Sequence, residues 1–402
     1  MQKKLSSPRS SAILLMITLL VLGLNLRPVL AAVGPLLDLI ENATGLSSTQ
    51  ASLLTTLPVL LMGVFALCAP FVKNTIGIDA GIRMGAVFIA LACLSRMVLT
   101  DRLGLIASAA VAGVGIALIQ ALIPAVIKRE FGIHAGRAIG LYTTAIMGGA
   151  VLAAASAAPM AALMGWNNAL AFWAVPAIVA VVLWTMLTRT SSDHGEKPAV
   201  SRSHRFWQRR RAWTLMIYFG IGTGAYTLVL AWLPSFYVTL GETRQTAGMM
   251  LAGLTLTEVA AGLAVSVIIG RFADKRLLLA GVLMCLLAGL SCMIVAPRPL
   301  AIPAMLLLGV GIGALFPLSM ILTLEHMEDP ALAGDIAAFV QGGGYIIASM
   351  MPLIAGSLRD RFADLTQAWW LMSAGVLVLL AMTVCFSPSS YKLLSREKCA
   401  AA

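Results

Sequence analysis

Gly23-Leu24-Asn25-Leu26-Arg27-Pro28 interrupts the first long apolar segment of the chain, residues 12–39. Arg27 therefore falls inside a stretch long enough to cross a membrane. An arginine at the centre of a membrane helix costs about 2.5–3.5 kcal/mol, so it usually faces a water-filled cavity or a charged partner. Pro28 removes a backbone donor and favours a kink at this point. The stretch predicts either a buried anion site or a structural ion pair, and both alternatives stay open here.

The composition indicates a polytopic membrane protein. The 402 residues are 60% hydrophobic and 11% charged, whereas a soluble domain has about 25% charged residues. The six cysteines lie in apolar segments or in the C-terminal tail, which implies no disulfide framework. The net charge of +11 comes mainly from basic residues in short loops, a pattern typical of membrane topology and not of nucleic-acid binding.

Twelve segments are apolar and long enough to span a bilayer. They are 12–39, 49–71, 84–99, 103–127, 138–164, 168–188, 213–238, 246–269, 277–296, 300–323, 333–355 and 367–388. We predict an all-α membrane protein with twelve transmembrane helices in two six-helix pseudo-repeats. The expected units are an N-terminal bundle (1–188), a cytoplasmic linker (189–212) and a C-terminal bundle (213–402).

The distribution of basic residues predicts which loops face the cytoplasm. With the N-terminus inside, most of the 28 lysines and arginines fall in cytoplasmic segments, as the positive-inside rule requires. The exceptions in the outer loops are Arg102, Arg244, Arg298, Arg359 and Arg361. Arg27 and Arg96 lie within spans, and we expect Arg96 to reach the outer interface by snorkelling. Both termini are thus expected on the cytoplasmic side of a bacterial inner membrane.

Short repeated motifs indicate that the two halves arose by duplication. Gly113-Val114-Gly115-Ile116 in span four resembles Gly309-Val310-Gly311-Ile312 in span ten. Ala135-Gly136 and Ala333-Gly334 recur at nearly the same separation. Parallel halves of this kind are the architecture of the major facilitator superfamily, whose halves rock around a central site. We therefore expect the outer ends of spans one and seven to approach each other when the carrier faces inward.

One loop resembles the cytoplasmic signature of that superfamily, Gly-x-x-x-Asp-Arg/Lys. It reads Gly270-Arg271-Phe272-Ala273-Asp274-Lys275-Arg276 and lies between spans eight and nine. The resemblance implies a cytoplasmic gate formed by Arg271, Asp274 and Lys275. A degenerate counterpart, residues 77–83, is expected in the loop between spans two and three. Ordinary topology-setting charge is the alternative reading of both loops.

The chain also resembles a narrower group, the cyanate permease and 2-nitroimidazole transporter family. The resemblance covers nearly the whole chain and rests on Gly23–Pro28, Val33–Leu37, Gln120–Pro124, Val126–Arg129, Ala231–Pro234, Phe236–Tyr237, Phe316–Leu318 and Gln341–Tyr345. It implies that spans one, four, seven and ten line the transport path. The solute-binding residues we expect are Arg27, Asn25, Gln120, Tyr226, Gln341 and Tyr345. Interhelical hydrogen bonding is the alternative for the glutamines and tyrosines.

Glu258 is the only acid well inside a predicted span. A buried carboxylate is suited to carry a coupling proton, and a salt bridge to Arg27 is the alternative role. The function we expect is secondary active transport of a small anionic or polar solute, a permease activity such as anion transport. Proton-driven efflux of nitroimidazole-like heterocycles is the runner-up, and a membrane-embedded enzyme is the rival of another class.

The expected partners are a small-molecule solute, the lipid bilayer and protons as the candidate coupling ion. We expect no nucleic acid, no cofactor and no metal, and a monomeric carrier. The four histidines lie in loops or at a span end, which argues against a catalytic cluster within the membrane. No Gly-x-x-x-x-Gly-Lys-Ser/Thr motif is present, which argues against ATP-driven transport by this chain.

Overall fold

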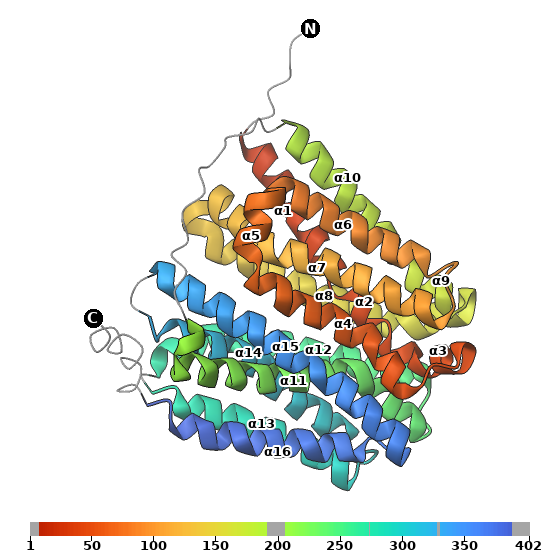
Figure 1. Cartoon of the computed structure of the whole chain (residues 1–402). Coiled ribbons are helices and arrows are strands. Elements are labelled where there is room, and N and C mark those ends of the chain that lie inside the picture. The colour runs from red at the N-terminus through yellow and green to blue at the C-terminus, as the bar shows by residue number, and fades with distance from the viewer. Residues whose placement is uncertain (1–7, 191–205, 273, 328–329, 388–402) are drawn as a thin grey trace.

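The computed structural model of the protein describes residues 8–190, 206–272, 274–327 and 330–387, and these fold as helices (Figure 1). Twelve helical segments in this described part are long and apolar enough to cross a membrane, which confirms the predicted number. The α-helices are α1 (Pro8–Asn25), α2 (Pro28–Ala31), α3 (Leu37–Thr44), α4 (Ser48–Leu67), α5 (Ala69–Ile76), α6 (Ile78–Ser95), α7 (Arg102–Phe131), α8 (Ala135–Met164), α9 (Trp166–Ala171), α10 (Ala174–Thr190), α11 (Arg210–Thr239), α12 (Arg244–Ile268), α13 (Arg276–Val295), α14 (Ala301–Leu324), α15 (Pro330–Phe362) and α16 (Thr366–Val384). The short 3₁₀ segments are η1 (Gly34–Leu36), η2 (Gly132–His134), η3 (Phe206–Gln208) and η4 (Ile269–Arg271).

Polar residues between the apolar runs start and stop these helices. Ser47 and Gln50 form a capping box at the start of α4, and Asp101 caps α7 by accepting from the Gly104 amide. Such caps satisfy backbone donors that the first turn leaves without partners. Gly45 ends α3 in the left-handed conformation, with φ of 65°. These three helix ends therefore lie where the local sequence supplies a capping side chain or a glycine.

The expected loop at residues 77–83 is wrong. Gly77 adopts a φ of 82° and α6 begins immediately afterwards, at Ile78. Asp79 thus lies in the first helical turn, where the helix dipole favours an acidic side chain. The predicted linker at 189–212 lies mostly outside the described residues, and the division into three units remains a prediction.

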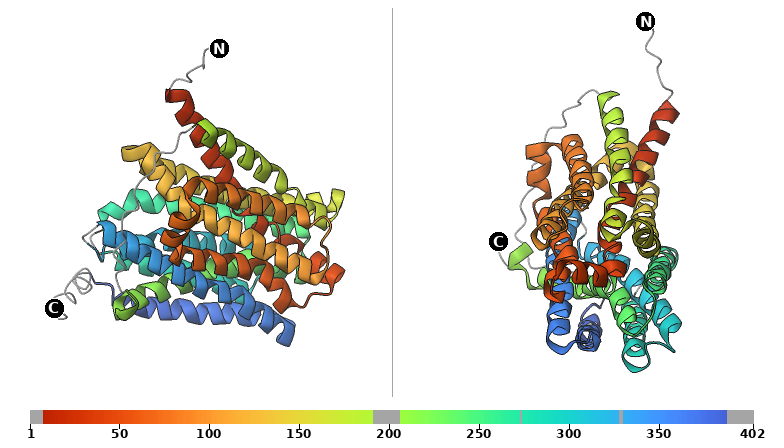
Figure 2. Two further views of the ribbon diagram at one scale, coloured as in Figure 1. Left: turned by 45° about the horizontal axis from the view of Figure 1, so that its top comes forward. Right: turned by 90° about the vertical axis from the view of Figure 1, so that its right-hand side faces the viewer.

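The helices gather in two groups, α1–α10 and α11–α16, which lie one above the other in Figure 1. Figure 2 shows the same two groups from other directions. α4 packs against α15, and α8 packs against α12, so these pairs form the seam between the groups. Small residues permit this close approach. A Cβ added at Gly63 would stand 2.6 Å from the Gly342 carbonyl oxygen, and one at Gly248 would stand 2.5 Å from the Ala154 oxygen.

Glycines at matching places in the two groups make matching contacts, which is consistent with an internal repeat. Gly113 of α7 packs on Pro58 of α4, and Gly309 of α14 packs on α12 at Thr257. Two residues later, Gly115 meets α6 and Gly311 meets α13. Each central helix thus presents one glycine to each of two neighbours in its own group.

Span one is broken at the place where the sequence predicts a kink. α1 ends at Asn25 and α2 begins at Pro28, followed by η1 and α3. Pro28 cannot donate a backbone hydrogen bond to the Leu24 carbonyl, as an unbroken helix would require. Gly149 of α8 lies against that carbonyl, so closely that a Cβ at position 149 would overlap it. The break and the glycine facing it therefore form one local structure.

Arg96 is placed differently from the expectation that it snorkels to the interface. Its side chain is 1% exposed and points inward from the end of α6. It donates from Nε to the Ser108 hydroxyl at 3.1 Å and from Nη1 to the Val29 carbonyl at 3.4 Å. Acceptors on two neighbouring helices hold it inside the protein, which a count of residues from the span end could not reveal.

Candidate functional site

Arg27 lies buried where span one breaks, with 6% of its surface exposed. Its guanidinium carbon is 5.3 Å from the centre of the Tyr226 ring on α11, within the range of a cation–π interaction. The Nε atom is buried without a hydrogen-bond partner. No carboxylate among the described residues forms an ion pair with Arg27. The cation is therefore held by an aromatic face while part of its donor capacity stays unused.

Polar groups from both sets of helices surround this arginine. Tyr142 of α8, Tyr226 of α11, Glu258 of α12 and Tyr345 of α15 all lie within electrostatic range of it. Three of their atoms, the hydroxyls of Tyr142 and Tyr226 and Glu258 Oε1, are buried without a hydrogen-bond partner. We call these five residues the Arg27 cluster. Buried polar atoms are normally satisfied, so a concentration of unsatisfied ones indicates a place for water or a ligand.

Glu258 is held in the cluster by close helix packing. Its side chain is 6% exposed, and its backbone touches Gly313 of α14 so closely that a Cβ at position 313 would overlap it. The carboxylate lies within electrostatic range of Arg27 without forming an ion pair with it. The alternative in which these two residues form a direct salt bridge is therefore not realised in this structure.

The other expected solute-binding residues are placed unequally. Tyr345 lies beside Gln341 and Arg27, and Gln341 is half-buried one turn earlier on α15. Gln120 is half-buried on α7. Asn25 turns away from the cluster, because its amide donates to the Val21 and Pro176 carbonyls at 2.6 and 3.1 Å. The structure thus brings Arg27, Tyr226, Tyr345 and Glu258 together and directs Asn25 toward α10.

Tyr142 is the member of the cluster that sequence reasoning missed. Its ring packs against Gly23 of α1, where an added Cβ would stand 3.0 Å from the ring. We expected path-lining residues on spans one, four, seven and ten, whereas Tyr142 belongs to span five. The available signal was a polar aromatic residue in an otherwise small-residue helix, together with a glycine in span one that could receive it.

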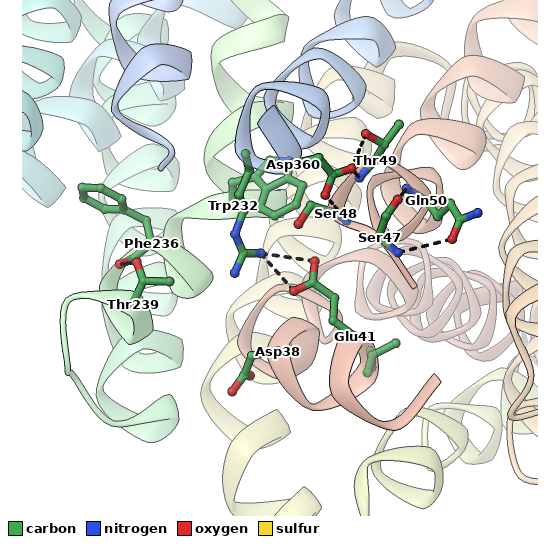
Figure 3. A network of polar contacts seen from close by, with 12 residues as sticks. Asp38, Glu41, Ser47, Ser48, Thr49, Gln50, Trp232, Phe236, Thr239 and Asp360 are labelled. Atoms are coloured by element: carbon green, nitrogen blue, oxygen red, sulfur yellow. Dashed lines mark hydrogen bonds and ion pairs between the residues drawn. The ribbon is translucent and has the colours of Figure 1, made fainter. Parts of the chain in front are cut away.

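Contacts between the two groups close the end of the molecule that carries α3, which we call the far side. Figure 3 shows these contacts around Glu41 and Asp360. Asp360 of α15 accepts hydrogen bonds of 2.8 Å from the amides of Ser48 and Thr49 at the start of α4. Arg359 pairs with Glu41 at 3.1 Å and lies 5.3 Å from the Trp232 ring centre. This network joins α3 and the first turn of α4 in one group to the last turns of α15 in the other.

Span one also meets the second group on the far side. Gly34 of η1 lies against α11, where an added Cβ would stand 2.8 Å from the Leu230 carbonyl oxygen. Asp38 pairs with Arg244 of α12 at 2.6 Å. Within the described part of the chain, the ion pairs that connect the two groups are the far-side pairs Asp38–Arg244 and Glu41–Arg359. Span one therefore contacts both α11 and α12 at this end of the molecule.

The expected gate residues lie at the opposite end, where α1 begins and α16 ends, which we call the terminal side (Figure 1). Arg271 is exposed. Asp274 pairs with the nearby Arg276 at 2.6 Å, and Lys275 pairs with Glu325 at the end of α14. The hydrogen bonds from Arg276 hold the pKa of the Asp274 carboxyl below its usual range. The loop is thus fastened within its own group, through Glu325 and Arg276, which sequence reasoning did not single out.

This arrangement suits reversible binding of a small molecule. A buried cation, three tyrosine hydroxyls and one carboxyl can hold a small polar or anionic molecule by hydrogen bonds and charge. Because the groups come from helices on both sides of the seam, a ligand there would contact both halves at once.

Comparison with known proteins identifies the family of the chain. Residues 13–352 match the model of the Major Facilitator Superfamily. The chain is 36% identical to the cyanate transport protein CynX of Escherichia coli, over 93% of this chain and 97% of that protein. It is 28% identical to the 2-nitroimidazole transporter of Escherichia coli, over 93% and 94% of the respective chains.

Solved structures give the same answer for the fold. A crystal structure of a D-xylose–proton symporter superimposes with a TM-score of 0.71, covering 92% of this chain and 97% of that one, at 14% sequence identity. An identity this low supports the fold alone. The family match and the two curated relatives carry the assignment further: this chain is a member of the major facilitator superfamily and belongs to the group of the cyanate and 2-nitroimidazole transporters.

Proposed function

We propose that this protein is a secondary transporter that binds a small anionic or polar solute at Arg27 and carries it across the membrane by alternating access. The observation that carries the proposal is the Arg27 cluster. A buried arginine without an ion pair lies beside three buried polar atoms without partners, contributed by α8, α11 and α12. A bound solute would satisfy these groups and connect the two halves.

An anion is the solute class that fits the charge of the cluster best. Guanidinium pairs with planar anions through two parallel hydrogen bonds, and Arg27 Nε has no other partner. The tyrosine hydroxyls can donate to the remaining oxygen or nitrogen atoms of such an anion. CynX is named for the transport of cyanate, which is a small anion.

A neutral nitroheterocycle is the second candidate, and the aromatic members of the cluster favour it. Tyr142, Tyr226 and Tyr345 offer ring faces as well as hydroxyls, and Glu258 can accept a hydrogen bond from a ring N–H. The related 2-nitroimidazole transporter is named for such a compound. In this version Glu258 carries the proton that drives efflux. A carboxyl next to a fixed cation can exchange its proton as the solute enters and leaves.

The remaining parts of the proposal concern topology and assembly. Among the described residues, most of the basic ones lie on the terminal side, so we propose that this side is cytoplasmic and that the membrane is the bacterial inner membrane. We propose that the carrier works as a monomer, with the whole Arg27 cluster supplied by one chain. We propose no enzymatic step, since the relatives are transporters and the cluster holds no nucleophile paired with a base.

Counterflow into proteoliposomes loaded with unlabelled solute tests the proposal, with labelled cyanate and labelled 2-nitroimidazole as probes. Arg27→Ala should abolish counterflow, and Arg27→Lys should raise the KM roughly tenfold or more, because a charge-assisted hydrogen bond is worth about 1.5–3 kcal/mol. Arg102→Ala is the matched control, since Arg102 is exposed and bonds only a backbone carbonyl in this structure. Normal transport by Arg27→Ala would refute the proposed site.

A further inference from the structure

We propose that Arg96 is a positioning residue that holds the broken part of span one, and with it Arg27, in the geometry that binds solute. The inference rests on the proposed function in one respect, the role of Arg27. It adds a residue from span three, a helix that contributes no member to the Arg27 cluster. Its basis is a chain of hydrogen bonds from α7 through Arg96 to the turn that carries Arg27.

Arg96 is the most deeply buried of the arginines whose side chains the structure describes, with 1% of its surface exposed. No carboxylate among the described residues pairs with it. Its charge is instead stabilised by oxygen atoms and by its position at the C-terminal end of α6, where the helix dipole favours a cation. A buried cation kept in place without an acid partner indicates a specific task for its donors.

The first donor fixes Arg96 to a rigid helix. Its Nε bonds the Ser108 hydroxyl at 3.1 Å, and that hydroxyl donates in turn to the Leu105 carbonyl at 2.7 Å within α7. The Nη2 atom has no partner. Arg96 is therefore oriented by α7 before it reaches span one.

The second donor supplies a hydrogen bond that the broken helix lacks. In a regular helix the Val33 amide would donate to the Val29 carbonyl. Here the Val33 amide donates to Leu30 instead, at 3.2 Å, which frees the Val29 oxygen. Arg96 Nη1 reaches that oxygen at 3.4 Å. An unsatisfied carbonyl inside a membrane protein is costly, so the contact stabilises this irregular conformation.

Val29 is linked directly to the position of Arg27. The amides of Leu30 and Ala31 both donate to the Arg27 carbonyl, at 3.0 and 2.9 Å, so the turn that contains Val29 closes on Arg27. A shift of Val29 would move this turn and redirect the guanidinium relative to Tyr226. A displacement of about 1 Å at a binding group can greatly weaken its interaction with a ligand. Arg96 therefore affects solute binding without touching the solute.

Two measurements on Arg96→Met, which keeps an unbranched apolar side chain and removes the donors, test the inference. The first is counterflow with labelled cyanate and labelled 2-nitroimidazole, analysed for KM and for maximal rate per folded carrier. The second is hydrogen exchange of the amides between Leu26 and Val33, which needs no solute. Arg102→Met is the matched control, because Arg102 also donates to a carbonyl of span one, that of Thr44 at its far end, at 3.1 Å.

We expect Arg96→Met to raise the KM roughly tenfold, as for loss of one charged hydrogen bond, with little change in maximal rate and faster exchange at Leu26–Val33. Arg96→Lys should recover part of the affinity, and Arg102→Met should change neither quantity at these residues. A fall in folded carrier with an unchanged KM would overturn the inference, as would unchanged exchange. If the wild-type protein shows counterflow of neither labelled solute, the proposed function fails. The hydrogen-exchange measurement alone then decides whether Arg96 holds the broken part of span one in place.

Discussion

Glu258 is the proposed carrier of a coupling proton. It is buried, it lies in the field of Arg27, and its Oε1 has no partner. Glu258→Gln should abolish accumulation driven by a pH gradient while leaving solute counterflow intact, because exchange of solute does not require the proton to cycle. The measurement is uptake into proteoliposomes with and without an imposed pH gradient.

Glu130→Gln is a suitable control for the Glu258 experiment, because Glu130 is exposed and pairs with its neighbour Arg129. Its removal should leave both kinds of transport unchanged. If Glu258→Gln retained full gradient-driven accumulation, the proton would have to travel by another group. Poor folding of the variant would instead indicate that Glu258 compensates the charge of Arg27.

The stability of the protein should depend on pH through His326, which lies on the terminal side. It is buried at the end of α14, where Nδ1 contacts the Leu322 carbonyl at 2.7 Å and Nε2 accepts from Arg211 at 3.1 Å. Burial, with a smaller contribution from the Arg211 charge, lowers the pKa of His326 to about 4. The unfolded chain, with a pKa near 6.5, therefore binds more protons between pH 6.5 and 4.

Stability should consequently be complete above about pH 6.5 and should fall as the pH drops toward 4, by up to about 3 kcal/mol from this group. His326→Gln keeps an acceptor for Arg211 and a donor for Leu322 but does not titrate, so its melting temperature should fall less over the same window. Thermal unfolding in detergent at a series of pH values is the measurement. Equal losses in both proteins would show that His326 is not the responsible group.

Individual residues show where prediction from sequence succeeds and where it stops. The burial of Arg27 inside the protein could be predicted, because a charge in the middle of a span would be costly if it faced the lipid. The burial of Arg96 could not, because near a span end the side chain can turn either way, and only the positions of Ser108 and Val29 decide. Tyr142 was missed for a related reason, since its direction depends on how α8 is rotated against α1.

At the scale of elements, the break in span one depends on a glycine in another helix. Gly149 lies against the Leu24 carbonyl with no room for a Cβ, whereas its neighbour Gly148 has nothing within 4 Å of an added Cβ. Gly149→Ala should therefore destabilise the protein by about 1–3 kcal/mol, as overpacking usually does. Gly148→Ala should be neutral or stabilising by up to about 1 kcal/mol, because alanine favours the helix.

Thermal unfolding of the two glycine variants in the same detergent provides the comparison. Because Gly149 contacts the residue three positions before Arg27, we also expect Gly149→Ala to weaken solute binding and Gly148→Ala to leave it unchanged. If both variants behaved alike, the packing of α8 against the broken segment would not be what maintains the break.

Helix number could be predicted better than helix boundaries. Apolar length alone identified all twelve spans, because a bilayer sets a minimum length for each. Span three was expected at 84–99, whereas α6 runs from Ile78 to Ser95. Its first turns carry Asp79 and Arg83, which hydropathy assigns to a loop although a helix can extend beyond the apolar core with charged residues on its surface.

At the scale of the whole molecule, the two groups of helices are held together on the far side by contacts that can be broken. The Asp38–Arg244 pair is partly exposed, and exposed ion pairs typically contribute about 0–1 kcal/mol each. The Glu41–Arg359 pair is more deeply buried. The hydrogen bonds of Asp360 to α4 are local to one helix end. A closure made of such contacts can open when solute binding favours the other state.

Alternating access requires this far-side closure to open in every transport cycle. Thr49 of α4 and Ser357 of α15 meet there, with their hydroxyl oxygens 3.5 Å apart, so cysteines at both positions can form a disulfide with little backbone movement. The measurement is counterflow by Thr49→Cys/Ser357→Cys protein, in a background without the native cysteines, before oxidation, after oxidation and after reduction. We predict that oxidation stops counterflow and that reduction restores it, whereas undiminished counterflow by fully crosslinked protein would contradict alternating access across this seam.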